Sequence, residues 1–119
     1  MAARTFREGA LSMPEAYEQD HFGAPSFRIC GKIFAQLSAD GATGLVKLPL
    51  ALQEWLATVH PEGCRIEPRW GRHGWTRITC ASLGADLCEE LIDLSWRAVA
   101  PRRLRNGSGA RPDGPHLPG

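Results

Sequence analysis

Apolar and polar residues alternate in the first half of the chain in a way that predicts β-strands. In "PSFRICGKIFAQL" (25–37) two alternating runs flank Gly31 and Lys32. Alternation with a period of two is typical of a half-buried strand, and a short loop containing glycine favours a hairpin between the runs. The alternation places Phe34 and the polar Gln36 on the face opposite Ile33, Ala35 and Leu37. We therefore expect a first hairpin that turns at Gly31 and Lys32.

Further strands are expected on either side of this hairpin and later in the chain. A third apolar run, "LVKLP", covers 45–49, and a preceding strand is placed at about 17–22. A second hairpin is predicted from strands at 64–69 and 74–80, joined by "WGRHG". The glycines of this connection tolerate the positive φ that a tight turn needs.

Helical periodicity predicts three helices. The first covers about 5–12, where Thr5 and Glu8 have the spacing of a capping box and the following proline ends the helix. A second follows Pro49, and a third lies between Gly84 and Pro101 with acidic residues in its first turns. The apolar residues expected to face the core in the second helix are Leu52, Trp55, Leu56 and Val59.

The order helix, strands, helix, strands, helix predicts an α+β fold, an antiparallel sheet with helices packed on one face. Residues 1–104 are expected to form a single domain. Residues 105–119 contain mostly glycine and proline without apolar periodicity, so we expect a disordered tail.

Composition adds limits to this picture. The 119 residues carry a net charge of only +1, whereas a protein that lives on nucleic acid is usually more basic. The N-terminus has no continuous apolar segment of the kind found in secretory signals. The four cysteines are scattered without a Cys-x-x-Cys pair, so we expect reduced, mostly buried thiols in a cytoplasmic protein.

The charge is unevenly distributed along the chain. Residues 64–83 have a net charge of +3 and residues 97–119 of +4, while residues 84–96 have −4. The acidic block lies in the first turns of the last predicted helix and so matches the helix dipole, without any need for an acidic binding site. Local basic surfaces therefore remain possible in a chain that is nearly neutral overall.

Four blocks resemble a known family when they are taken in order. They are "HFGAPSFRICGKIFA" (21–35), "LVKLP" (45–49), "GRHGWTRI" (71–78) and "LCEELIDLSWRAVAPRRL" (87–104). Together they resemble the MmcQ/YjbR family over about residues 5–104. The resemblance implies a fold similar to the CyaY/frataxin class and a bacterial cytoplasmic protein of a kind often described as DNA-binding.

Two functions remain open on these residues. Arginines of two hairpins acting as paired wings would contact phosphates, and exposed tryptophans would stack on unpaired bases. Alternatively, the open sheet is a protein-interaction surface, and then apolar area should be exposed between the arginines, with Phe34 and Trp70 the residues to inspect. Trp75 is expected to pack, and Arg77 to sit over an aromatic ring or reach a ligand. The candidate nucleic-acid-binding residues are Arg28, Lys32, Arg65, Arg69, Trp70, Arg72, His73 and Arg77.

Catalysis and metal binding are not expected. The chain has no P-loop, no His-Glu-x-x-His motif and no Ser/His/Asp set, and Cys30 with His73 is a pairing that chance supplies often. His21 is expected to make a structural hydrogen bond. The resemblance to CyaY raises iron binding, but Glu15, Glu18 and Asp20 are too sparse to hold a hard cation well. We expect no cofactor and no metal.

Overall fold

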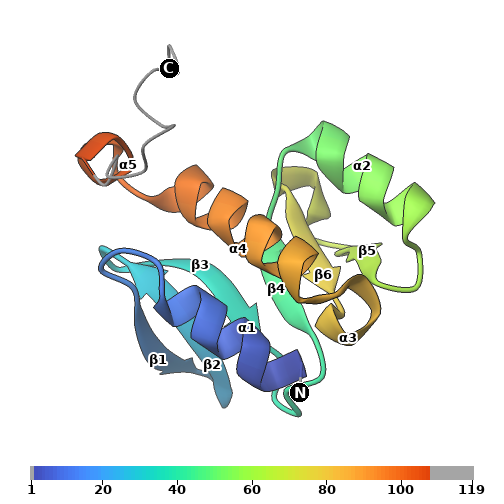
Figure 1. Ribbon diagram of the computed structural model, residues 1–119, viewed down its shortest axis with the longest axis horizontal. Coiled ribbons are helices and arrows are strands. Elements are labelled where there is room, and N and C mark those ends of the chain that lie inside the picture. The colour runs from blue at the N-terminus through green and yellow to red at the C-terminus, as the bar shows by residue number, and fades with distance from the viewer. Residues whose placement is uncertain (1, 108–119) are drawn as a thin grey trace.

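The chain is organised around one six-stranded antiparallel sheet, seen in a computed structural model that describes residues 2–107 (Figure 1). The strands follow the spatial order β1-β2-β3-β4-β6-β5, so β1 and β5 form the two edges. They are β1 (Tyr17–His21), β2 (Ala24–Ile29), β3 (Lys32–Leu37), β4 (Gly44–Lys47), β5 (Cys64–Ile66) and β6 (Trp75–Ile78).

Helices pack on one face of this sheet, as the sequence predicts (Figure 1). The α+β prediction and its order of helices and strands are confirmed, with short additional helices around the last predicted one. No helix within residues 2–107 is long and apolar enough to cross a bilayer. The helices are α1 (Ala2–Leu11), α2 (Leu50–Val59), α3 (Cys80–Leu83), α4 (Ala85–Val99), α5 (Arg102–Gly107) and the 3-10 helix η1 (Gly71–His73).

The core lies between the sheet and α4, which buries its apolar stripe against β3 and β4. The ring of Phe6 in α1 packs 6.1 Å from that of Phe27 in β2. Ser95 is a buried polar residue in α4 that joins the layers: its hydroxyl donates to the carbonyl of Phe34 and accepts from the backbone N–H of Lys47 at 2.7 Å. One side chain thus fixes α4 against two neighbouring strands.

The predicted start of the first helix and the predicted start of the tail both need correction. α1 spans Ala2–Leu11, so Thr5 lies inside the helix and not at its N-cap position. At the other end of the chain, α5 extends the structure to Gly107, three residues into the predicted tail. Its Leu104 is buried against the core, which gives this short helix an anchor. The rest of the predicted tail, residues 108–119, lies outside the described residues.

The first hairpin turns one residue earlier than predicted, and its alternation is interrupted. Cys30 and Gly31 form the turn, both with positive φ (52° and 82°). The register shifts where β2 meets β3, because Phe27 pairs with Ala35 and Arg28 with Ile33. This β-bulge turns Phe34 inward, and its side chain is fully buried. The prediction that Phe34 shares a face with polar residues is therefore wrong.

The face of α2 that packs on the sheet is also different from the predicted one. Trp55 and Val59 are 55% and 46% exposed, while Gln53 is buried with Leu56. Gln53 is buried because its side-chain N–H groups donate to the carbonyl of Gly71, in the loop before β6, and to that of Trp75 in β6. A polar residue whose hydrogen bonds are satisfied therefore lies on the buried face of α2, where the periodicity predicts only apolar residues.

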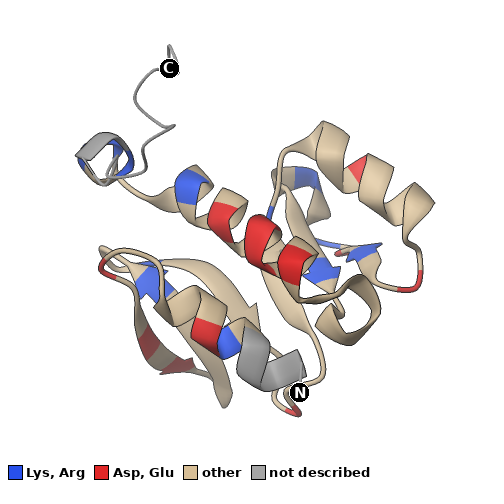
Figure 2. Ribbon diagram, in the orientation of Figure 1, with Lys and Arg blue, Asp and Glu red and all other residues tan. Residues whose placement is uncertain are grey.

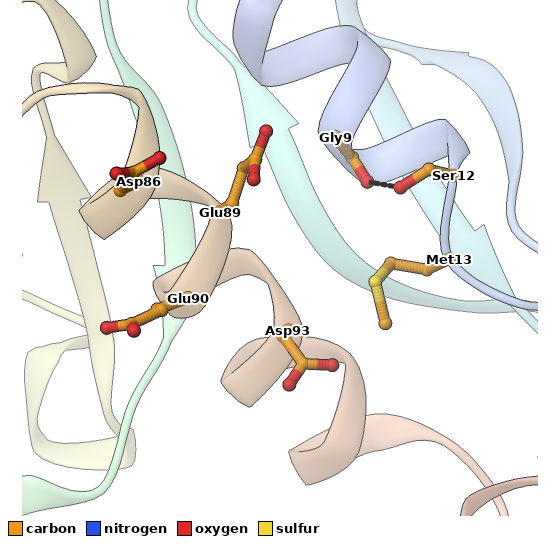
Figure 3. A pocket seen from close by; sticks show the side chains of 7 residues that line it. All are labelled: Gly9, Ser12, Met13, Asp86, Glu89, Glu90 and Asp93. Carbon is orange, nitrogen blue, oxygen red and sulfur yellow. Dashed lines mark hydrogen bonds between the residues drawn. The ribbon is translucent and has the colours of Figure 1, made fainter. Parts of the chain in front are cut away.

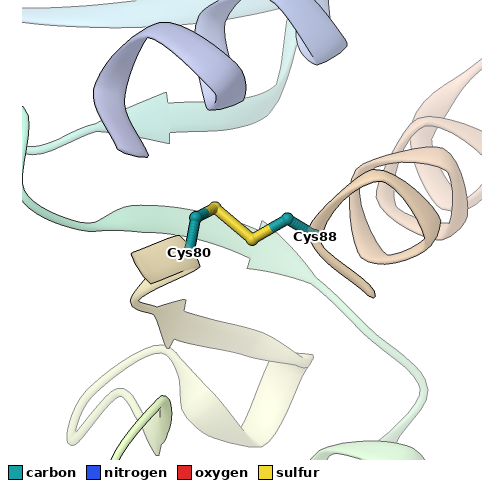
Figure 4. Close-up of a disulfide and its surroundings, with 2 residues drawn as sticks. All are labelled: Cys80 and Cys88. Carbon is teal, nitrogen blue, oxygen red and sulfur yellow. A yellow bond between two sulfur atoms is a disulfide. The ribbon is translucent and has the colours of Figure 1, made fainter. Parts of the chain in front are cut away.

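Two cysteines form a disulfide, so the expectation of four reduced thiols is wrong for this pair (Figure 4). Cys80 begins α3 and Cys88 lies in the second turn of α4, with 5.7 Å between their Cα atoms. The chain reverses at Gly84, at a φ of 92°, and this brings the two helices together. Cys30 is an exposed free thiol and Cys64 a buried one.

Candidate nucleic-acid interface

The strand directions bring both predicted basic hairpins to one end of the sheet. β2 ends and β3 begins at Cys30 and Gly31; β4 ends and β6 begins at the same end, because Lys47 pairs with Trp75. We call this the turn end. The two hairpins flank β4, which lies between them, so they are not the adjacent pair of wings that the sequence predicts. Figure 2 shows most of the basic segments along this side of the molecule.

The β2–β3 turn supplies the first basic group. Lys32 is exposed at the start of β3, and no ion pair is seen for it among the described residues. Arg28 is half-buried, with its guanidinium 3.1 Å from the hydroxyl of Ser26 and 3.3 Å from the ring of His21. Since neither partner carries a negative charge, the charge of Arg28 is held in place but not compensated. The predicted structural role of His21 agrees with this contact.

α5 adds basic residues that the sequence analysis did not include. Arg103 lies 3.8 Å from the sulfur of Cys30 and the same distance from a carboxylate oxygen of Glu15. These contacts place α5 beside the β2–β3 turn, with Arg102 and Arg105 exposed on the same helix. The sequence signal for them is the run "PRRLR", in which residues 101–104 end the predicted domain and Arg105 begins the predicted tail.

The second group lies on residues 67–74, which we call the 67–74 loop. Arg69, Trp70, Arg72 and His73 are all exposed on it, and Arg72 donates to the ring of His73 at 3.3 Å. No ion pair is seen for Arg69 or Arg72 among residues 2–107. The loop therefore presents cationic side chains whose charge no neighbouring carboxylate cancels.

Arg77, by contrast, is already engaged. Its Nε donates to Glu67 at 2.7 Å and a second guanidinium nitrogen donates to the hydroxyl of Thr43 at 3.1 Å. Both members of the Arg77–Glu67 pair are largely buried, so the charge is compensated within the sheet. The predicted alternative of an aromatic partner for Arg77 is replaced by this ion pair. Trp75 is half-buried on the sheet face that points away from the helices, and is not a core residue.

That outward sheet face, which we call the open face, mixes apolar and basic side chains. Cross-strand pairing aligns Leu45 with Arg77, and Arg77 in turn with Arg65 of the edge strand. Tyr17, 41% exposed, pairs with Arg28 at the other edge. Arg65 is exposed but lies away from the turn end. Like charges directly opposed on neighbouring strands repel, so the pairing of Arg65 with Arg77 does not stabilise the sheet.

The opposite end of the sheet is acidic. The exposed carboxylates there belong to Asp20, Asp40, Glu62 and Asp86. A groove of about 520 Å³ between α1 and α4 adds further carboxylates, because Glu89 and Asp93 of α4 line it together with Gly9, Ser12 and Met13 (Figure 3). Hydrogen bonds from Ser38 and from the N–H of Ala42 lower the pKa of Asp40, so its charge persists at lower pH. Charge is therefore separated along the strand direction.

The carboxylates considered above as iron ligands make structural contacts. Glu18 pairs with Arg7 of α1 through two hydrogen bonds of 3.0 and 3.1 Å, and this pairing raises the pKa of Arg7. Asp20 accepts the backbone N–H of Gly23 in the β1–β2 turn. Within residues 2–107 no group of three metal-ligating side chains comes together.

Comparison with known proteins identifies the family. The family model YjbR matches residues 11–98, and the chain belongs to this family. Among solved structures it is similar to the crystal structure of Deinococcus radiodurans protein DR2400, a DUF419 domain. The two share 20% sequence identity at a TM-score of 0.71, over 87% of this chain and 84% of that one, which shows a shared fold. No curated protein matches the chain.

Proposed function

We propose that the turn end binds the phosphate backbone of nucleic acid without sequence specificity. The observation that carries the proposal is the convergence of uncompensated cations at one end of the sheet. Lys32 and Arg28 come from the β2–β3 turn, and Arg69 and Arg72 from the 67–74 loop. α5 adds further arginines beside them. Phosphate contacts of this kind supply affinity and orientation but do not read sequence.

The elements that carry these cations also favour backbone contacts over base reading. The basic side chains lie at the strand ends beside the β2–β3 turn, on the 67–74 loop with its one-turn 3-10 helix, and on a six-residue helix. Sequence-specific proteins commonly place one long helix in the major groove and aim several polar side chains from it at base edges. Binding through the turn end is therefore weak, sensitive to salt and without a catalytic step of its own.

Salt titration tests the proposal most directly. Each phosphate contact with duplex DNA contributes about −0.9 to the slope of log K against log salt concentration, so six contacts give about −5. Fluorescence anisotropy with a labelled duplex should show saturable binding with a linear log–log salt plot. An Arg69→Ala/Arg72→Ala double variant should reduce the size of the slope by about 2.

A charge-matched control variant distinguishes the effect of losing the proposed site from the effect of lowering the net charge. The Arg7→Ala/Arg65→Ala double variant also loses two positive charges, but both lie outside the turn end. It should keep a slope close to that of the unmodified protein. Equal losses of slope in the two double variants would contradict the proposal, because net charge alone would then explain binding.

The second candidate, a protein-interaction surface, rests on the open face. Half-exposed Ile33, Leu45 and Trp75 interrupt the row of basic side chains there, which is the pattern expected of a protein-binding sheet. Absence of binding to any polyanion, even at low salt, would favour this candidate. A crosslinked partner that is lost on a Leu45→Lys substitution would then support it.

We place the nucleic-acid-binding activity in the cytoplasm, where nucleic acid is available. Disulfides are rare there because cytosolic thiols are kept reduced. Cys80 and Cys88 are both buried, however, and poor access slows attack by an external thiol. Thiol trapping on cell lysis, followed by mass measurement, gives the redox state of this pair and tests the assignment.

A further inference from the structure

We infer that the turn end binds single-stranded nucleic acid in preference to duplex, with Trp70 as the surface on which an unpaired base stacks. This inference rests on the proposed function and adds the class of ligand. A duplex hides the faces of its bases, whereas a single strand offers both phosphates and open base faces. Aromatic side chains beside a cationic track are how proteins without sequence preference hold single strands.

Trp70 has the exposure that stacking requires. Its side chain is 54% exposed, although tryptophan is among the largest apolar residues. None of the ring pairs found among the described residues involves it. Single exposed apolar side chains are common, so exposure makes Trp70 available for stacking, and its neighbours determine which ligand suits it.

Those neighbours are cationic. Arg69 precedes Trp70 directly and Arg72 follows two residues later; within the described part of the chain, no ion pair is seen for either arginine. Lys47 lies on the adjoining strand, paired with Trp75. A base stacked on Trp70 would thus have its flanking phosphates within the reach of long cationic side chains. Charge complementarity selects a polyanion with aromatic rings over a neutral apolar partner.

The backbone under Trp70 is fixed before any ligand arrives. Its carbonyl accepts the N–H of His73 at 3.0 Å and that of Trp75 at 3.4 Å. The buried side chain of Gln53 donates to the carbonyl of Gly71 at 3.1 Å, and so ties the loop to α2. A Cβ at Gly71 would collide with Ile66, so the loop runs in close contact with β5. Binding to a fixed loop costs little ordering entropy.

Trp55 offers a comparison within the same molecule. It is 55% exposed, nearly the same as Trp70, but its ring packs edge-on against that of His60 at 6.1 Å. Its sequence neighbour Glu54 carries a negative charge, so a phosphate would be repelled there. Exposure is therefore equal at the two tryptophans, and only Trp70 combines a free ring with cations.

The experiment compares three oligonucleotide probes of one length, twelve nucleotides, at a fixed low salt concentration. They are a labelled oligo(dT), an abasic strand with the same phosphates, and a duplex. The unmodified protein should bind oligo(dT) more tightly than either of the others. Removing one stacked base lowers affinity by about 5- to 150-fold, so the abasic strand and the Trp70→Ala variant with oligo(dT) should both weaken by that range.

Matched variants test whether a loss of affinity is specific to stacking on Trp70. Trp70→Phe retains a stacking face and should recover most of the affinity, while Trp55→Ala should bind like the unmodified protein. Urea unfolding of each variant confirms that the loop remains folded. Equal affinity for oligo(dT) and the abasic strand would overturn the inference, and so would equal losses in Trp70→Ala and Trp55→Ala.

Failure of the proposed function would look different. In that case none of the three probes binds at low salt, and Arg69→Ala/Arg72→Ala changes nothing. If phosphate binding is present but stacking is absent, all three probes bind with salt-dependent affinity, the abasic strand binds as well as oligo(dT), and Trp70→Ala has no effect. The two outcomes are thus separated within one set of titrations.

Discussion

Replacement of Gly74 by alanine probes the close approach that positions the 67–74 loop. Gly74 has a φ of 99°, where an L-residue pays about 1–2 kcal/mol. A Cβ there would also collide with the carbonyl oxygen of Leu48, a backbone atom that cannot rotate away. Relief of the collision would break the 2.8 Å hydrogen bond from the N–H of Leu48 to the carbonyl of Gly74, at a further cost of about 1–3 kcal/mol.

Gly23→Ala is the matched control, because Gly23 has a similar φ of 88° but no atom within 4 Å of the added Cβ. The effect of alanine on the unfolded chain is the same in both variants and cancels in the difference. We expect Gly74→Ala to lower the unfolding free energy by about 2–5 kcal/mol and Gly23→Ala by about 1–2 kcal/mol.

Urea unfolding followed by tryptophan fluorescence measures both values. Affinity for oligo(dT) should fall in the Gly74 variant, because the loop must shift, and remain unchanged in the Gly23 variant, whose turn lies at the acidic end. Costs that agree within about 0.5 kcal/mol would refute the reasoning, since the contact with Leu48 would then contribute nothing.

Three further changes have defined outcomes. Closing an eight-residue separation by the disulfide should stabilise the protein by about 2–3 kcal/mol; reductant should remove this in the unmodified protein but have no effect on a Cys80→Ala/Cys88→Ala variant. Burial raises the pKa of the Cys64 thiol to about 11, so the unfolded chain loses this proton first as pH rises. The stability contributed by the protonated thiol is complete below its ordinary pKa of about 9, and about 2 kcal/mol of it should be lost by pH 11. The difference between the unmodified protein and Cys64→Ala in urea unfolding measures this loss, and parallel pH curves would contradict it. Ser95→Ala should cost about 2–3 kcal/mol in the same assay, because backbone groups of β3 and β4 lose their buried partner, and a cost below 0.5 kcal/mol would show that water replaces the hydroxyl.

The sequence predicts the sheet well because burial follows alternation wherever the pleat is regular. Strands at 17–22 and 45–49 are found within one or two residues, and the second hairpin is present as predicted. The prediction fails at Phe34, since a bulge adds a residue and reverses which side chain points inward. Nothing in a local pattern of two-residue period marks where such a residue is inserted.

The remaining differences come from contacts between distant segments. Gln53 is buried because carbonyls of a loop 18 or more residues away accept its hydrogen bonds, which helical periodicity cannot show. The Cys80–Cys88 disulfide depends on the reversal at Gly84. In the candidate site, the individual arginines are visible in the sequence. The structure is needed to show that Glu67 neutralises Arg77, because this ion pair depends on the register of the strands.

The separation of charge along the strands gives the molecule an electric dipole, and the dipole determines how it meets a polyanion. The molecule measures 35 × 31 × 26 Å. At about 0.01 M salt the Debye length of about 30 Å spans nearly all of it, so an approaching strand attracts the turn end and repels Asp40 and Asp86 together. At about 0.15 M the Debye length of about 8 Å is far shorter, and the two ends act independently. Dilute salt should therefore accelerate association through attraction before contact, and neutralising Asp40, which removes a repulsion, should accelerate it further at low ionic strength while leaving the dissociation rate unchanged.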